Sequence, residues 1–178
     1  MLEYKFLGQF TQESDKIIVS DPVNDIDQNI PKVKNVQKGI WYAWSLVDGE
    51  INRNCELITI HKDKTEIDDN GDAEYDDNDY NWTLRNCVSV DSGQAGIYDS
   101  MYYADEDNVI GCKLYEAFID NDKWYAANCY ATMIQPNAGT IPNGVVSSSG
   151  YGDGTYQFFV CKTNNKIVGI KIIFIEDR

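Results

Sequence analysis

Two glycine-rich segments hold the residues of this chain whose types and spacing could do chemistry. The segment 144–156 reads GVVSSSGYGDGTY and sets three serines and the carboxylate of Asp153 among four glycines. The segment 90–99 reads VDSGQAGIYD and sets Asp91 and Ser92 before a glycine. Glycine is this dense where the backbone takes positive φ or lies against another group. We therefore expect the functional site at these two segments.

Asp91 and Asp153 could act as a pair, because each lies in a glycine-flanked turn at the end of a predicted strand. Two converging carboxylates can perform general acid–base catalysis, hold a divalent ion, or bind a cationic or polyhydroxylated ligand. The alternative is that each carboxylate closes an Asx-turn on its own backbone. Since their strands must share one core in a domain of this size, we expect the two turns to meet in space.

A polar pocket at these turns would use short polar side chains and tyrosine rings as ligand contacts. Asp21, where proline ends another predicted strand, is placed at the same end of the fold. If the site is catalytic, its catalytic residues are Asp91 and Asp153. The predicted ligand-binding residues are Asp21, Asp91, Ser92, Gln94, Ser149, Tyr151, Asp153 and Tyr156.

The acidic segment 63–81 contains one further pattern with a chemical meaning. The spacing of Asp68, Asn70 and Asp72 around Gly71 resembles the ligand spacing of a calcium loop. The pattern is incomplete, because glutamate stands at the first position, aspartate at the twelfth, and no amphipathic helix flanks it. A solvated acidic loop is the alternative. Weak calcium binding is the only cofactor expectation, since no phosphate loop, dinucleotide fingerprint or zinc spacing occurs.

The elements that must position these residues are mostly strands. Runs rich in β-branched and aromatic residues, separated by turn signals, occur at 4–10, 16–20, 40–47, 55–61 and 84–90. Alternation favours a further strand over 124–133, whereas 109–119 is ambiguous between helix and strand. The segment 63–81 has few apolar residues and is predicted to be a long exposed loop. The last third predicts an antiparallel meander of strands 144–148, 155–162 and 166–175.

Short strands at this spacing, with little helix, predict a mainly β fold. The expected architecture is an antiparallel β-sandwich or distorted barrel with one or two short helices. A length of 178 residues suits a single domain spanning 1–178. The hydrophobic content of 43% is typical of a globular protein rather than a disordered one.

Charge and hydropathy exclude several classes of partner. With 29 acidic and 15 basic residues the formal net charge is −14, which repels nucleic-acid backbones and anionic membrane surfaces. No run of about 18 apolar residues predicts a spanning helix, and the first residues lack the pattern of a signal peptide. We therefore expect a cytoplasmic protein with no membrane partner and no direct contact to a nucleic-acid backbone.

Cysteine and histidine usage fits the same setting. The chain has 5 cysteines, an odd number with no C-x-x-C pair, so we expect reduced thiols. His61 is the single histidine and ends a predicted strand. A serine or cysteine nucleophile would depend on that one base. We therefore expect His61 to be a structural residue bonded to backbone.

Several of these segments together resemble a known family. Ser-Asp-Pro at 20–22, the run 53–61, Trp124-Tyr125 with Cys129, and the two glycine-rich segments are similar in order and spacing to the domain of unknown function 4241 (DUF4241) family. The similarity covers most of the chain and rests chiefly on the glycine-rich segments. One departure is Val23-Asn24, where such proteins often carry Cys-Tyr. The resemblance implies a bacterial or phage origin and an intracellular setting, and it brings no activity.

Three functions compete on these features, and whether the protein is an enzyme stays open. The first is a binding module with a polar Gly/Ser/Asp pocket for a small ligand or a partner protein. The second is a hydrolase that uses Asp91 and Asp153, with or without a metal. The third is an acidic decoy that occupies the basic site of a nucleic-acid enzyme, motivated by the charge of −14. We rank the binding module first and the hydrolase second.

Overall fold

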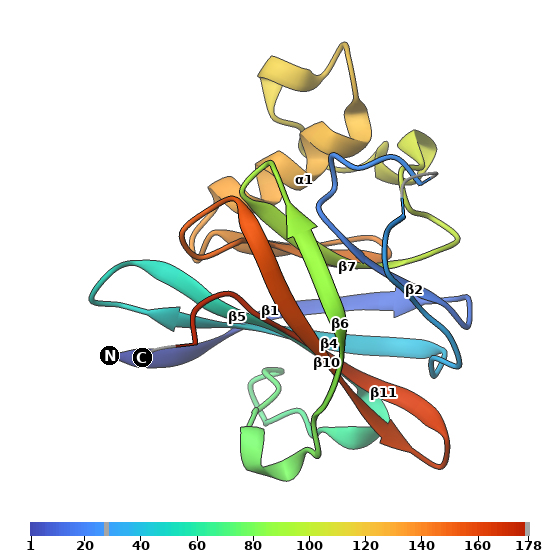
Figure 1. Cartoon of the computed structure of the whole chain (residues 1–178), viewed down its shortest axis with the longest axis vertical. Coiled ribbons are helices and arrows are strands. Elements are labelled where there is room, and N and C mark those ends of the chain that lie inside the picture. Colours follow the sequence, from blue (N-terminus) through green and yellow to red (C-terminus); the bar gives the residue numbers. More distant parts are fainter. Residues whose placement is uncertain (27–28, 177–178) are drawn as a thin grey trace.

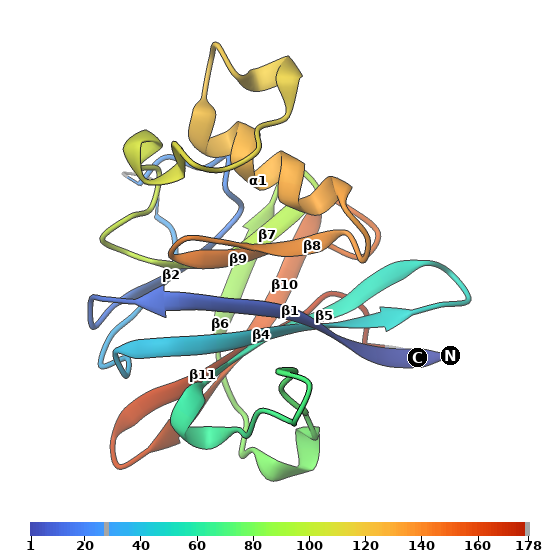
Figure 2. The ribbon, with the colours of Figure 1, turned by 180° about the vertical axis from the view of Figure 1, so that it is seen from behind.

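The computed structural model describes residues 1–26 and 29–176, and in these residues it contains two antiparallel β-sheets (Figure 1, Figure 2). The first sheet has the strand order β1 (Leu2–Gln12), β4 (Gly39–Asp48), β5 (Arg53–His61), β11 (Lys166–Ile173), β10 (Gly154–Thr163) and β6 (Thr83–Val90). The second sheet has the order β3 (Lys32–Val33), β2 (Ile17–Ser20), β7 (Gln94–Asp99), β9 (Gly144–Ser148) and β8 (Ala138–Ile141). The prediction of a mainly β, sandwich-like fold is confirmed.

The main core lies between the two sheets. Ile97 and Val145 from the second sheet and Trp41 and Leu57 from the first belong to one buried cluster. Each side chain of this size stabilises the fold by about 1.5–3 kcal/mol when it leaves water. The predicted hairpin of β4 and β5 is present, with the two strands antiparallel. Figure 2 shows the second sheet lying above β1 and β4.

The outer face of the second sheet is covered by the helix α1 (Lys123–Met133), and the prediction of a strand over 124–133 is wrong. The Asp122 side chain caps the helix by accepting a hydrogen bond from the Tyr125 amide at 2.9 Å. Trp124 is 2% exposed and packs against Tyr98 of β7, with their ring centroids 5.1 Å apart. The segment is helical because a helix buries Trp124 and Ala127 on the same face. In a strand, residues three positions apart would point to opposite faces.

The three C-terminal strands exist, but they do not form one meander. β10 and β11 pair in the first sheet, whereas β9 pairs with β7 and β8 in the second. The chain therefore crosses from one sheet to the other through the turn after β9. Gly150 has φ +57° there, and a Cβ on it would lie 3.0 Å from the Phe174 Cβ. Glycine is required at this crossing for both reasons.

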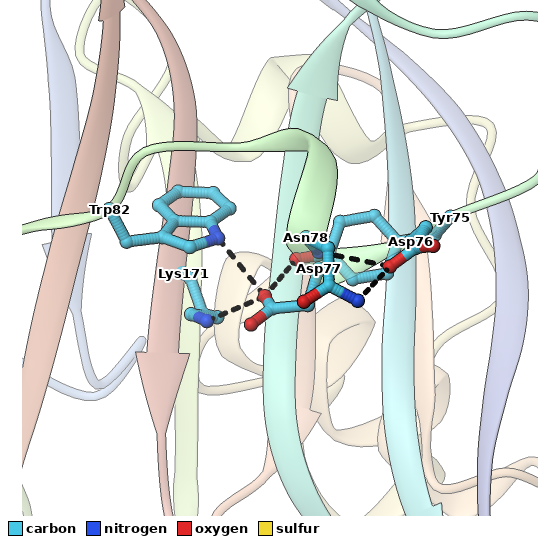
Figure 3. Close-up of polar contacts among 6 residues, drawn as sticks. All are labelled: Tyr75, Asp76, Asp77, Asn78, Trp82 and Lys171. Atoms are coloured by element: carbon cyan, nitrogen blue, oxygen red, sulfur yellow. Dashed lines mark hydrogen bonds and ion pairs between the residues drawn. The ribbon is translucent and has the colours of Figure 1, made fainter.

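The acidic segment 63–81 is not a loop that simply extends into solvent, which corrects the sequence prediction. It lies on the outer face of the first sheet, where Trp44 Nε1 donates to Ala73 O at 2.9 Å. Asp77 accepts hydrogen bonds from Tyr75 of the segment, from Trp82 directly after it and from Lys171 of β11 (Figure 3). The aromatic residues placed among the carboxylates are what hold the segment on the sheet.

Other short elements complete the described chain. Single 3₁₀ turns occur at Lys62–Lys64, Asp77–Asp79, Glu106–Val109 and Glu116–Phe118. The ambiguous segment 109–119 is thus mostly turn and loop, with no long helix or strand. Within residues 1–26 and 29–176, no helix has the length and apolar character needed to cross a membrane.

Candidate functional site

The structure brings the two glycine-rich turns together. β6 and β10 pair antiparallel, with Val90 opposite Gly154. Asp91 and Asp153 directly adjoin this pair of residues and therefore lie at the same end of the two strands. Both side chains are exposed to solvent. The long-range contact expected from the sequence between the two turns is present in the fold.

Asp21 connects the end of β2 to the Asp91 turn. Its carboxylate is fully buried and accepts from the Asp91 amide at 2.8 Å and from the Ser92 amide at 2.7 Å. The Ser92 hydroxyl donates to the other carboxylate oxygen at 2.6 Å, as does the Val23 amide at 2.9 Å. Both oxygens are engaged by these donors. Asp21 and Ser92 thus hold the turn in place rather than face a ligand.

A polar pocket of about 290 Å³ opens where the turn after β9 passes the turn before β7. The Ser149 amide donates to Gly93 O at 3.0 Å and ties the two turns together. We name this pocket the Arg53 pocket, after the charged residue in its lining. Of the predicted ligand-binding residues, Ser149 and Tyr151 line it. The full lining is Asn52, Arg53, Gly93, Asn137, Ser148, Ser149, Gly150, Tyr151 and Gly152.

Arg53 is held from two sides while its side chain stays exposed to solvent. One guanidinium nitrogen donates to Gly150 O at 2.9 Å, and the guanidinium carbon lies 5.3 Å from the centroid of the Tyr151 ring. Among the described residues, Arg53 forms no ion pair with a carboxylate. A guanidinium has five N–H donors, so most of its hydrogen-bonding capacity remains for a ligand.

Asn54 lies next to Arg53 in the chain and ties β5 to the second sheet. Its side-chain amide donates to Asn137 O at 3.0 Å and to the Ser147 and Ser148 hydroxyls at 2.9 and 3.2 Å. Asn54 is 1% exposed, and its Oδ1 accepts no hydrogen bond within the described part of the chain. Because Asn137 and Ser148 also line the pocket, this network fixes the pocket wall.

Tyr156 braces the turn from behind instead of contacting a ligand. Its hydroxyl donates to Gly152 O at 2.6 Å and lies 3.1 Å from Ser149 O. The Ser149 hydroxyl adds a bond to the same Gly152 oxygen at 2.8 Å. Burial raises the pKa of Tyr156, which keeps the hydroxyl protonated and able to donate. The turn is therefore rigid before any ligand arrives.

The remaining predicted residues lie elsewhere. Gln94 is buried under α1, where its side-chain nitrogen lies 3.3 Å from the Cys129 sulfur. Asp91 lines a separate polar pocket of about 520 Å³ with Asn24. Asp153 follows Gly152 in the chain and is not part of the lining of the Arg53 pocket. The predicted set is thus divided: some residues line or support the Arg53 pocket, Asp91 lines another pocket, and Gln94 and Asp153 line neither.

The predicted calcium ligands are engaged in a turn. Asp68 Oδ1 accepts from the Asn70 amide at 2.8 Å and from the Asp72 amide at 2.9 Å. These hydrogen bonds lower the pKa of Asp68, that from Asp72 most strongly. In residues 1–26 and 29–176 no group of three or more His, Cys, Asp or Glu side chains could hold a metal. Weak calcium binding here stays a prediction, which calorimetry at millimolar calcium can test.

His61 is a structural residue. Its Nε2 lies 2.8 Å from Lys38 O, and its Nδ1 accepts from the Asp63 amide at 3.1 Å. Both ring nitrogens are therefore used by backbone groups, which agrees with the sequence expectation. The ring is 2% exposed and meets Trp41 edge to face, so no substrate reaches it.

Sequence reasoning missed Arg53 and Asn54 as site residues. In the sequence, Arg53 is only the first residue of the run 53–61 that resembles the family, and that resemblance implies no chemical role for it. One signal was available, because Arg53 directly follows a hairpin turn in a strongly acidic chain. Asn54 carried no signal, since its partners come from residues more than eighty positions away.

Comparison with known proteins identifies a family for this chain but assigns it no activity. A family model described as a protein of unknown function (DUF4241) matches residues 10–172 of the 178. No curated protein and no solved structure matches the chain. The matched region runs from β1 to β11 and includes Arg53, Asn54 and both glycine-rich turns. The chain therefore belongs to the DUF4241 family.

Proposed function

We propose that this chain is a binding module whose Arg53 pocket takes a small ligand with one carboxylate group. The observation that carries the proposal is an exposed arginine with no carboxylate partner among the described residues, in a chain with 29 acidic residues. Arg53 is held instead by Gly150 O and the Tyr151 ring. A guanidinium fixed in this way is a preorganised group for carboxylate recognition.

The charge of the protein restricts the ligand to a small one. A polyanion such as a nucleic acid would be repelled by the net charge of −14. A single carboxylate meets the guanidinium at contact distance, where the local attraction exceeds the screened repulsion of distant charges. The volume of about 290 Å³ is at the small end for a ligand pocket.

The rest of the lining supports a ligand with a second polar group. Asn52, Asn137 and Ser148 can donate or accept, which suits an amide or hydroxyl. Tyr151, which is 69% exposed, offers a flat apolar surface beside the guanidinium. The predicted class is therefore a small carboxylic acid with an amide or hydroxyl, such as an acylated amino acid.

The other functions suggested by the sequence receive less support. Asp91 and Asp153 are both exposed, and neither the Arg53 pocket nor the pocket of about 520 Å³ contains both, so these two pockets offer no enclosed site for a carboxylate hydrolase. The acidic decoy rests on the net charge alone. A partner protein that presents a C-terminal carboxylate would satisfy the same chemistry as a small acid.

An NMR titration with N-acetylglycine tests the proposal, with N-acetylglycinamide as the uncharged comparison. We expect the acid, but not the amide, to shift the backbone amide signals of Gly93 and Gly150. Arg53→Met should weaken the binding about tenfold or more, because a hydrogen bond to a charged group contributes about 1.5–3 kcal/mol. Arg85→Met is the matched control, since Arg85 is also exposed but lies near the start of β6.

Two results would contradict the proposal. Equal shifts from the acid and the amide would mean that the pocket does not select a carboxylate. Equal weakening by Arg53→Met and Arg85→Met would mean that the ligand responds to overall charge and not to this pocket. A titration of a short peptide with and without a C-terminal amide separates a small-acid ligand from a protein C-terminus.

A further inference from the structure

A third pocket, of about 410 Å³, lies on the outer face of the first sheet, between β1 and the acidic segment. It shares no lining residue with the Arg53 pocket. We name it the aromatic groove. Its aromatic and acidic lining residues are Tyr4, Phe6, Trp44, Tyr75, Asp72 and Glu74.

The half-buried rings of Tyr4, Phe6 and Tyr75 are inclined to one another, and the latter two pack against Trp44, which is 1% exposed. The ring centroids of Tyr4 and Tyr75 are 4.7 Å apart at an interplanar angle of 68°. Trp44 lies 5.4 Å from Tyr75 at 39°, and Phe6 lies 5.7 Å from Trp44 at 52°. An aromatic face carries the negative part of the ring quadrupole, so such a surface attracts cations.

Nearby carboxylates strengthen the attraction of the groove for cations. Asp72 and Glu74 are exposed at the mouth, and Glu56, 4% exposed on β5, lies close enough to Tyr75 for its charge to act on that ring. Burial first, then the hydrogen bond to Asp77 and the nearby negative charges, raise the pKa of Tyr75. The phenol therefore stays neutral in a negative field, as a cation-binding ring must.

The basic residue that lines the groove does not cancel this field. Lys5 pairs with Glu3 on its own strand, with 2.6 Å between Nζ and Oε1. Its charge is thus already balanced by a neighbouring carboxylate. Of the charged lining residues, Asp72 and Glu74 remain, and both are acidic.

One ammonium group of the protein, that of Lys171 on β11, is already held at the end of the acidic segment by the same chemistry. Lys171 Nζ lies 4.9 Å from the centroid of the Trp82 ring and 2.7 Å from Asp77 Oδ1 (Figure 3). Asp77 of the segment and the ring of Trp82, which directly follows the segment, therefore hold a buried ammonium group. In the aromatic groove, rings and carboxylates again line one site.

We propose that the aromatic groove binds an alkylammonium cation. The chemistry fits a quaternary ammonium head such as that of choline, or a methylated lysine side chain, because both combine a positive charge with methyl groups that pack on aromatic rings. A hydrated inorganic cation would keep its water shell and gain little from the rings. This site is independent of the proposed carboxylate pocket, and either can fail without the other.

The tryptophan indole N–H signals give a local readout for the test. Trp44 Nε1 donates to Ala73 O, and both residues line the groove. Trp124 Nε1 donates to Pro22 O under α1, away from the groove, and serves as the internal reference. Choline should shift the Trp44 signal in a saturable way and leave the Trp124 signal in place. The neutral isostere 3,3-dimethylbutanol should shift neither at the same concentration.

Variants assign the binding to rings and carboxylates separately. Tyr4→Leu should weaken choline binding about five- to tenfold, equivalent to about 1–1.4 kcal/mol, because it removes one cation–π contact. The double variant Asp72→Asn with Glu74→Gln changes two exposed groups, so the fold is retained and binding should weaken several-fold. Tyr115→Leu changes an exposed tyrosine outside the groove; it is the matched control and should bind like the parent.

A trimethyllysine peptide, compared with its unmodified lysine counterpart, separates the two sources of the cation. Tighter binding of the peptide than of choline identifies a protein partner, and the reverse identifies a free small molecule; both support the site. Three results would overturn the proposal: equal shifts with choline and its neutral isostere, unchanged binding in both groove variants, or no Trp44 shift with any alkylammonium probe at millimolar concentration.

Discussion

Asp77 gives the sharpest test of how the acidic segment is held on the sheet. Its Oδ1 accepts from Tyr75 at 2.6 Å, from Lys171 at 2.7 Å and from Trp82 at 3.0 Å. Asp77→Ala removes all three bonds and leaves the Lys171 ammonium, 7% exposed, without its carboxylate. Breaking a buried pair costs about 3–5 kcal/mol. Because the Asp77 side chain is 44% exposed, we expect a smaller loss, about 2–3 kcal/mol of unfolding free energy.

Urea unfolding followed by tryptophan fluorescence measures this loss. The same change should lower the melting temperature by about 5–10 °C in a protein of this size. Asp79→Ala is the matched control, because its carboxylate is exposed on the same 3₁₀ turn; it should change stability by less than about 0.5 kcal/mol. Lys171→Met in the Asp77→Ala background should add little further loss, since the unpaired ammonium is removed with it.

The pH dependence has a definite sign. Burial by itself would raise the pKa of Asp77, but the hydrogen bonds from Lys171, Tyr75 and Trp82 hold it below its ordinary value. A carboxylate of this kind contributes stability that is fully present above its unfolded pKa and is lost as the pH falls through its lowered folded pKa. The gap between parent and Asp77→Ala should thus be constant near neutral pH and shrink below about pH 4. A gap that persists unchanged in strong acid would refute the reasoning, as would a loss below about 0.5 kcal/mol.

Four further outcomes follow from the site and its supports. Asp21→Asn places an amide where four donors point at a buried carboxylate, so we expect a loss of about 2–4 kcal/mol in urea unfolding; a neutral result would mean that the turn is held by other contacts. Gly150→Ala should cost about 1–3 kcal/mol, because the residue has positive φ and its new Cβ meets Phe174. Asp153→Asn should strengthen N-acetylglycine binding up to about fivefold by removing a nearby negative charge, whereas weaker binding would mean that Asp153 contacts the ligand itself. Thiol titration of the denatured, non-reduced protein should find all 5 cysteines free.

The strands could be predicted because their signals are local, and the meeting of the two glycine-rich turns followed from the need of their strands to share one core. β-branched and aromatic runs define each strand, and glycine marks each turn. Which sheet a strand joins is not a local property. For this reason the sequence predicts β9 in a meander with β10 and β11, whereas β9 pairs with β7 and β8. Its pattern of apolar residues suits pairing with β10 as well as with β7. Only packing against α1 and the main core distinguishes the two.

The helix α1 was missed because its residues alternate between tyrosine, alanine and cysteine, which are weakly apolar and fit either period. Its centre is buried almost all round, from Trp124 to Cys129, so no clean polar face appears in the sequence. The helix start was readable, since Asp122 is a favoured N-cap residue. The role of Arg53 was not readable, because the carbonyl and ring that hold it come from a turn about a hundred positions away.

The salt dependence of ligand affinity distinguishes the two proposed sites in a single protein sample. Both lie on a protein with a net charge of −14, so the long-range field attracts a cation to the aromatic groove and repels an anion from the Arg53 pocket. Added salt screens that field beyond about 8–10 Å at physiological strength. The affinity for choline should therefore fall as salt rises, whereas the affinity for N-acetylglycine should fall less, because screening also relieves its repulsion. Parallel falls would indicate that contact charges alone decide both affinities and that the acidic field contributes nothing to selection.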